Sequence, residues 1–202
     1  MLIMERSLIR VRRKKLDMIT SAPWGLYSEI VEKSNEKWIF REPEVSDGND
    51  IYRLISECPP LDVNSSYCNF LQSTHFSKTC ILVEHKGDLA GFISSYQKPN
   101  EPNVLFIWQV AVDPRFRGNA LAYKMIDALL KREWMEGIDA IETTITKSNQ
   151  ASWALFKKLD AKNGSSGEVT TFLDENVHFN GRHDTEYLYR IPLNNHKLIG
   201  IK

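Results

Sequence analysis

The segment from Gln109 to Ala120 joins an apolar run directly to a helix, and its residue types suit the binding of an anion. Pro114 ends the apolar run, while Gly118 and the small Ala120 let consecutive backbone N–H groups face outward where the helix starts. These N–H groups and the helix dipole together form a site that suits a pyrophosphate. Positive charge and further contacts are expected from Arg115, Arg117 and Asn119. A plain strand-to-helix turn with surface arginines is the alternative.

Two common phosphate-binding motifs do not describe this segment, because it lacks both Gly-Lys-Ser/Thr and the G-x-G-x-x-G spacing. The chain has 26 basic and 26 acidic residues, and this balance argues against binding to a nucleic-acid backbone. Its three cysteines contain no C-x-x-C pair, which indicates neither a disulfide framework nor a metal site and favours a reducing, cytoplasmic compartment. We therefore expect a small-molecule partner.

The apolar pattern predicts an α/β (α+β) fold with the anion-binding segment near its centre. Residues 104–112 are apolar except for Gln109, and this run is about half the ~20 residues that cross a membrane. We therefore expect a central strand covered on both faces. A helix over 118–134 and a strand over 138–146 follow it. The other predicted elements are strands at 38–40, 79–83, 90–94 and 186–191, and helices at 46–55, 65–75 and 149–159.

The chain is expected to divide into a basic extension at 1–35, one domain at 36–193 and a tail at 194–202. Six basic residues stand against one acidic residue in the first sixteen positions. No apolar run follows them, so a signal peptide is not indicated. A nucleic-acid or membrane-surface arm, a partner-binding helix, and a solvated extension or non-native leader remain the alternatives.

Two motifs in this order resemble the GNAT superfamily of N-acetyltransferases. Residues 110–120 resemble its acetyl-CoA-binding motif, with Arg115, Gly118 and Ala120 at the Arg-x-x-Gly-x-Gly/Ala positions. Residues 149–159 resemble its second motif helix. The resemblance implies a GNAT fold, whose mixed central sheet is flanked by helices and splays between its fourth and fifth strands. It also implies acetyl-CoA as co-substrate, with contacts from Val110, Ala111, Val112, Asn149 and Phe156.

A closer resemblance, over about residues 37–192, is to the L-2,4-diaminobutyrate acetyltransferases of ectoine biosynthesis. It is carried by Leu61–Cys68, Phe106–Val112 and Glu142–Asn149. The implied product is N4-acetyl-L-2,4-diaminobutyrate, and a homodimer is implied by this resemblance alone. An acetyltransferase for another small amine, and a non-catalytic acyl-CoA sensor, are the alternatives.

This reaction needs a proton acceptor, because an alkylammonium with a pKa near ~10.4 must lose a proton before it attacks a thioester. Asp62, Glu142 and Glu186 are the candidate carboxylates, and the N–H of Val110 is the candidate oxyanion donor. The resemblance surrounds the amino acid substrate with Asp62, Asn64, Ser65, Tyr67, Trp108, His183 and Glu186.

Several of these residues have structural alternatives. Asp62 can cap the next helix, Trp108 can belong to the core rather than face an ammonium group, and His183 can be a solvated loop residue. Glu142 can face solvent instead of the cleft. Phe156 stands where many family members carry a tyrosine that protonates the leaving thiolate, so we expect another donor, such as Tyr67 or water, or unassisted departure of the thiolate.

Overall fold

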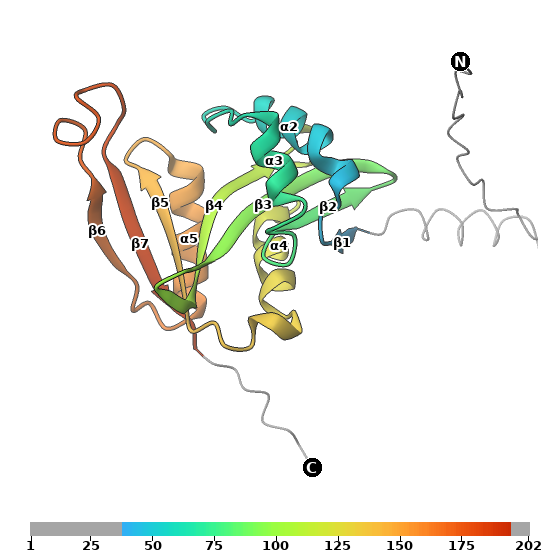
Figure 1. The fold of residues 1–202 in the computed structure, drawn as a ribbon. Helices are drawn as coiled ribbons and strands as arrows, with labels where there is room; N and C mark the ends of the chain where they lie inside the picture. Colours follow the sequence, from blue (N-terminus) through green and yellow to red (C-terminus); the bar gives the residue numbers. More distant parts are fainter. Residues whose placement is uncertain (1–37, 195–202) are drawn as a thin grey trace, which may run out of the picture. The chain divides into compact units, whose positions relative to one another are not determined.

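The computed structural model describes residues 38–194, which form a seven-stranded mixed sheet and the helices that flank it (Figure 1). The strand order is β1-β2-β3-β4-β5-β7-β6, and only the β4–β5 pair is parallel. The predicted basic extension at 1–35, the first two residues of the predicted domain and the tail beyond Asn194 lie outside the described residues. The strands are β1 Ile39–Arg41, β2 Ile81–His85, β3 Asp88–Lys98, β4 Glu101–Val112, β5 Ala140–Thr146, β6 Glu168–Leu173 and β7 Glu186–Pro192.

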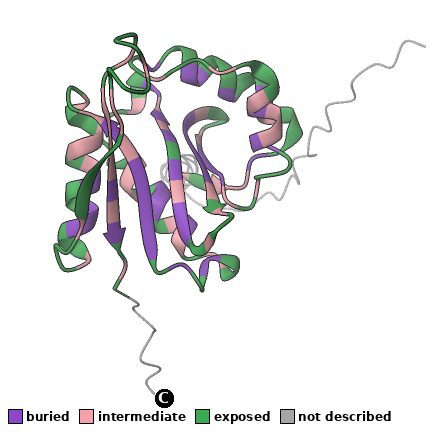
Figure 2. Ribbon diagram, turned by 60° about the vertical axis from the view of Figure 1, so that its left-hand side comes forward, coloured by how far each residue is buried: buried purple, intermediate pink, exposed green. Residues whose placement is uncertain are grey.

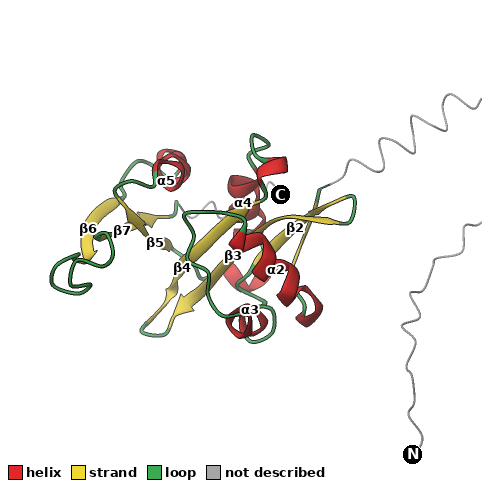
Figure 3. Cartoon of the chain, turned by 90° about the horizontal axis from the view of Figure 1, so that it is seen from above, coloured by secondary structure: helices red, strands yellow, loops and turns green. Residues whose placement is uncertain are grey.

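Helices cover both faces of the sheet, with α2 and α3 on one side and α4 and α5 on the other (Figure 3). One hydrophobic cluster packs α4 and α5 against the sheet through side chains such as Ile107 and Met125, and a second packs α2 through Ile51 and Phe92. The helices are α2 Gly48–Ser56, α3 Ser66–Gln72, α4 Leu121–Leu130 and α5 Gln150–Lys162, with short 3-10 turns η1 Val45–Asp47, η2 Pro114–Phe116 and η3 Glu133–Met135.

The sheet opens between β4 and β5, which confirms the expected splay. These strands pair only from Val104 opposite Ala140 to Phe106 opposite Glu142, although both continue well beyond that point. The register of β3 with β4 shifts at Trp108, which is an extra residue in β4. Such a bulge bends a strand and increases its twist. The bulge therefore lies where β4 departs from β5.

The structure adds one strand that the sequence pattern did not predict. The edge strand β6 pairs with β7 alone and is exposed over most of its length (Figure 2). Its residues do not alternate between apolar and polar, because neither face is covered by a core. The helix predicted over 118–134 also differs: α4 begins at Leu121 and ends at Leu130, and η3 follows it.

Candidate active site

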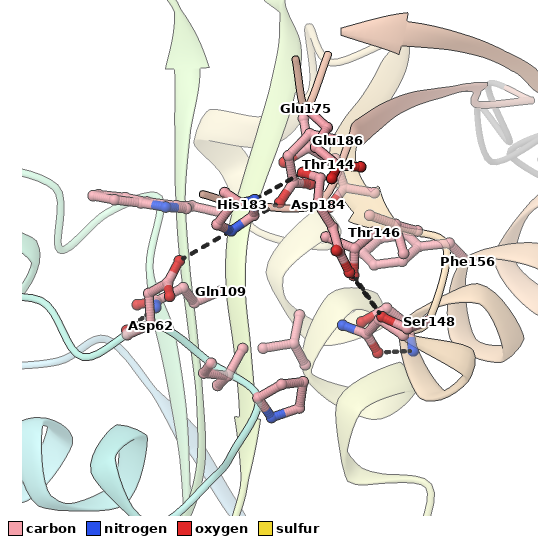
Figure 4. A pocket seen from close by; sticks show the side chains of 18 of the residues that line it. Asp62, Gln109, Thr144, Thr146, Ser148, Phe156, Glu175, His183, Asp184 and Glu186 are labelled. Carbon is pink, nitrogen blue, oxygen red and sulfur yellow. Dashed lines mark hydrogen bonds and ion pairs between the residues drawn. The ribbon is translucent and has the colours of Figure 1, made fainter. Parts of the chain in front are cut away.

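A cavity of about 420 Å³ occupies the gap between β4 and β5 (Figure 4). Its walls come from segments that are far apart in the chain: a loop near Asp62, the middle of β4, the end of β5, the start of α5 and the loop before β7. The volume is in the range of small-molecule sites. Of the side chains that line it, the close-up labels Asp62, Gln109, Thr144, Thr146, Ser148, Phe156, Glu175, His183, Asp184 and Glu186.

One side of the cavity is the unpaired backbone edge of β4. The N–H of Asp113 donates to the carbonyl of Ala90 on β3 at 3.0 Å. Because backbone groups alternate along a strand, the N–H and C=O groups of Val110 and Val112 point away from β3, into the gap. The carbonyl of Val112 accepts a hydrogen bond from Arg117 Nε at 3.2 Å instead of from a strand. This edge can therefore bind an extended, amide-containing ligand.

The loop after β4 turns its backbone outward through two left-handed residues, Gly118 at φ 86° and Ala120 at φ 56°. Within residues 38–194, the N–H groups of Gly118, Asn119 and Ala120 have no protein acceptor. They lie immediately before the first turn of α4, where the helix dipole also favours an anion. This geometry fits the pyrophosphate predicted from the sequence.

The two arginines of this loop differ in their surroundings. Arg115 is held by Asp113 at 2.7 Å and by Asp88 at 3.3 Å, and its hydrogen bond lowers the pKa of Asp113. Much of the Arg115 charge is thus already balanced. Arg117 has no carboxylate partner among the described residues. Of the two arginines, Arg117 therefore keeps more of its positive charge available for an anion.

The cavity brings together three ionisable side chains: Asp62 from the loop before α3, His183 from the loop before β7 and Glu186 from the start of β7. The Nε2 atom of His183 lies 4.0 Å from Asp62 Oδ2 and 3.8 Å from Glu186 Oε1. The pKa of His183 is raised, mainly by its hydrogen bond with the backbone carbonyl of Asp184 and then by the neighbouring carboxylates. Burial raises the pKa of Glu186 above its ordinary value. The arrangement suits a cationic ligand that competes with a protonated histidine.

A buried glutamine holds the Asp62 loop against β4. The amide nitrogen of Gln109 donates to the backbone carbonyl of Asp62 at 2.8 Å, and its amide oxygen accepts from Asn64 at 3.3 Å. Ser65, not Asp62, caps α3 by accepting from the N–H of Cys68. Asp62 therefore does not cap α3, and it lines the cavity.

The aromatic candidates have different environments. Trp108 lines the cavity and is 46% exposed, so it is not a core residue. Tyr67 is 69% exposed and, like Asn64 and Ser65, does not line the cavity in this structure. Phe156 lines the cavity although it is almost completely buried. Asn149 also lines it and caps α5 by accepting from the N–H of Ser152.

Glu142 does not lie in the cavity, and neither expectation for it is correct. It is 2% exposed and binds Lys98 at 2.8 Å and Arg190 at 2.6 Å. Glu101 binds the same two cations, at 2.6 and 2.8 Å. The network joins β3, β4, β5 and β7 at the closed end of the splay. Glu142 is the buried member of this network, and removing one of its cations leaves part of its charge uncompensated, so its role is structural.

Sequence reasoning missed several cavity residues because no local pattern marks them. Thr144 and Thr146 lie on the end of β5, and their alternation also fits an ordinary strand. The segment between β6 and β7 contributes Glu175, Arg182 and Asp184, and the sequence assigned that segment no structure. Within residues 38–194, no cluster of three or more His, Cys, Asp or Glu residues suits a metal, and no helix is long and apolar enough to cross a membrane.

Comparisons with known proteins agree with this geometry. The model of the acetyltransferase (GNAT) family matches residues 48–161. The chain is 72% identical over 176 residues to an L-2,4-diaminobutyric acid acetyltransferase from Vibrio parahaemolyticus, covering 87% of this chain and 97% of the relative. A protein of the same name from Vibrio cholerae is 57% identical over 168 residues, covering 83% and 97%.

A solved structure is similar over most of the fold. It is the diaminobutyrate acetyltransferase EctA from Paenibacillus lautus, in complex with its substrate L-2,4-diaminobutyric acid and coenzyme A. The similarity has a TM-score of 0.74 and 35% identity, and it covers 78% of this chain and 95% of that one. The family match over more than half of the chain and these sequence identities show that the chain belongs to the GNAT family and, within it, to the L-2,4-diaminobutyric acid acetyltransferases.

Proposed function

We propose that this protein transfers the acetyl group of acetyl-CoA to the N4 amine of L-2,4-diaminobutyrate. The product is N4-acetyl-L-2,4-diaminobutyrate, the precursor of ectoine. The observation that carries the proposal is the cavity itself, which joins an open strand edge to the carboxylates of Asp62 and Glu186. The 72% identity to an enzyme of that name supports the same substrate.

The acidic end of the cavity suits a substrate with two ammonium groups. Four carboxylates line it, from Asp62, Glu175, Asp184 and Glu186. Asp62 and the face of Trp108 hold the α-ammonium group in its charged form, which makes it non-nucleophilic. The N4 amine then lies toward Glu186 and the β4 edge. Regioselectivity follows because only one nitrogen is both deprotonated and close to the thioester carbonyl.

Glu186 accepts the proton from the N4 ammonium, directly or through a water molecule. Its carboxylate is half-buried and has a raised pKa, so it is a stronger base than an exposed glutamate. His183 lies between Glu186 and Asp62, with its Nε2 atom within 4.0 Å of both carboxylates. Asn64 and Ser65 position the Asp62 loop, whereas Tyr67 is exposed and does not line the cavity.

Attack of the amine nitrogen on the thioester carbonyl forms a tetrahedral intermediate, whose oxyanion accepts a hydrogen bond from the N–H of Val110. Collapse of the intermediate breaks the C–S bond, and the departed CoA thiolate takes up the proton that the nitrogen loses as the amide forms. Phe156 has no proton to donate, and a thiol of ordinary acidity, with a pKa near ~8.5, leaves without a general acid. Val110, Ala111, Val112 and the 115–120 loop bind the donor.

The decisive experiment is to incubate the protein with acetyl-CoA and a panel of amines while the free thiol is followed. We expect thiol release with L-2,4-diaminobutyrate and product acetylated only at N4, as determined by NMR. Preference for a polyamine or another amine by tenfold or more in kcat/KM would contradict the proposed substrate. Absence of thiol release with every amine, together with tight acetyl-CoA binding, would indicate a sensor.

We also propose that residues 36–193 form the catalytic domain and that two copies associate in the cytoplasm. The unpaired cysteines Cys58, Cys68 and Cys80 suit a reducing compartment. The edge strand β6 exposes Val169 and Phe172, which suits contact with a second copy. Light scattering of the purified protein measures the mass, and a monomer at micromolar concentration would contradict the dimer.

A further inference from the structure

A pair of lysines from α5 converges on one aromatic ring of α4. Lys158 and Lys162 are one helical turn apart, and their Nζ atoms lie 5.3 Å and 4.7 Å from the centroid of the Tyr123 ring. We call these two residues the lysine pair. Two ammonium groups over one ring repel each other, and the negative face of the ring offsets only part of that repulsion.

The face between α4 and α5 has no negative charge to balance the lysine pair. The single carboxylate of α5, Asp160, is buried and accepts hydrogen bonds from Tyr189 at 2.8 Å and from the N–H of Gly167 at 2.9 Å. On α4, Asp127 forms an ion pair with Lys131 at 2.7 Å. In the part of the chain that the structure describes, neither member of the lysine pair has a carboxylate partner. The site therefore suits an anion.

The lysine pair and Tyr123 lie next to the 115–120 loop, which is proposed to bind the pyrophosphate. Tyr123 is the third residue of α4, which starts directly after Ala120. A rise of 1.5 Å per residue puts it only about 4.5 Å along the helix axis from that loop. Long side chains in helices lean back toward the N-terminus, which brings the ring closer still. α4 and α5 lie on the same side of the sheet (Figure 3), so both helices can contact one ligand.

Acetyl-CoA carries a second anion at a matching separation. Its pyrophosphate is attached to the 5′ oxygen of a ribose, and the same ribose carries a phosphate on its 3′ oxygen. A pyrophosphate held by the N–H groups of Gly118 and Ala120 therefore leaves a dianionic group a few ångströms away. We propose that the lysine pair and Tyr123 form the subsite for the 3′-phosphate of acetyl-CoA and so select CoA over dephospho-CoA. The proposal rests on acetyl-CoA being the acetyl donor.

Donor selectivity tests this subsite, with acetyl-CoA compared with acetyl-dephospho-CoA, which lacks only the 3′-phosphate. We expect the wild-type KM for acetyl-dephospho-CoA to be about tenfold higher, with kcat unchanged. The double variant Lys158→Gln/Lys162→Gln should raise the KM for acetyl-CoA by about the same factor and leave that for acetyl-dephospho-CoA unchanged. The matched control is Lys131→Gln, which removes a paired lysine next to α4 and should change neither KM.

Two further measurements separate this subsite from the proposed reaction. Calorimetric titration with CoA and dephospho-CoA needs no turnover, so the subsite is testable even if L-2,4-diaminobutyrate is not the substrate. Circular dichroism checks that the variants are folded. Equal affinity of the wild type for the two ligands would overturn the proposal, as would an equal loss of both affinities in the double variant.

Discussion

The two ends of the proposed site, which we call the donor end and the acceptor end, present different kinds of groups to a ligand. The donor end consists of main-chain groups: Val110 of the β4 edge, which lines the cavity, and, outside the cavity lining, Val112 and the N–H groups of the loop that contains Gly118. The acceptor end uses side chains, with His183 between Asp62 and Glu186. Backbone groups are present whatever the residue, so the donor end depends on chain geometry, whereas the acceptor end depends on residue identity. Substitutions at the donor end should therefore impair the binding of acetyl-CoA, and those at the acceptor end should impair the use of L-2,4-diaminobutyrate.

The largest effect is expected from distorting the donor end. Gly118→Pro should abolish acetyl-CoA binding, because proline removes an N–H donor and cannot adopt the φ of 86° found there. Gly118→Ala is the matched control: it keeps the N–H and pays only the left-handed strain of roughly 1–2 kcal/mol. Titration calorimetry measures both, after circular dichroism has confirmed folding. Wild-type affinity in a folded Gly118→Pro variant would contradict the assigned loop.

Glu186→Gln should have the next largest effect, and it should act on the acceptor alone. Loss of a charge-assisted hydrogen bond costs roughly 1.5–3 kcal/mol, which corresponds to about ten- to a hundredfold in kcat/KM for L-2,4-diaminobutyrate. The KM for acetyl-CoA should stay within twofold. Steady-state kinetics with each substrate varied in turn measures the split. Equal losses for donor and acceptor would remove the distinction between the two ends.

Asp62→Asn should produce the same acceptor-specific loss at a smaller size. The Asp62 side chain is 83% exposed, whereas that of Glu186 is 19% exposed, so water screens the Asp62 charge more strongly. We expect about a three- to tenfold loss in kcat/KM. Product analysis by NMR should also show some acetylation at the α-nitrogen. A larger loss than in Glu186→Gln, with kcat restored at high pH, would make Asp62 the base instead.

The pH dependence should also belong to the acceptor end. The pKa values of His183 and Glu186 are both raised, so their protonated forms persist to higher pH than usual. Protonated His183 competes with the substrate ammonium for the two carboxylates. The KM for L-2,4-diaminobutyrate should therefore fall as pH rises through a value above the ordinary 6.5 of histidine. His183→Gln should remove that limb of the profile, while the KM for acetyl-CoA stays flat in both proteins. If the KM for L-2,4-diaminobutyrate still falls with rising pH in the variant, a group other than His183 causes that dependence.

The smallest effect is expected where the two ends meet. Phe156→Tyr introduces a hydroxyl at a side chain that is 1% exposed, and we expect kcat to change by less than about threefold. Thiolate departure needs little help, so a new proton donor adds little. Pre-steady-state measurement of thiol release tests this. A tenfold gain, equivalent to ~1.4 kcal/mol, would show that general-acid catalysis limits the wild type.

The donor end could be recognised from the sequence because its determinants are contiguous. Pro114 and Gly118 between an apolar strand and an amphipathic helix predict the turn, and the structure has the left-handed Gly118 at that position. The central strand and the strands that correspond to β2 and β3 were likewise predicted, since the apolar pattern of a strand is a local signal. Exposed β6, without a buried face, left no such signal.

Only the tertiary structure decided which charged residues meet. Asp62 and Glu186 are 124 positions apart, and Glu142 is nearer in sequence to Glu186 than Asp62 is, yet it is Asp62 that lies beside His183. Glu142 instead binds Lys98 and Arg190. Successive side chains of a strand point to opposite faces of the sheet, and the local sequence does not specify what covers each face. Sequence alone determined the chain's family, its central elements and the turn that contains Gly118. Strand order, the bulge at Trp108 and the splay determined the acceptor pocket, because they bring distant loops to the same cavity.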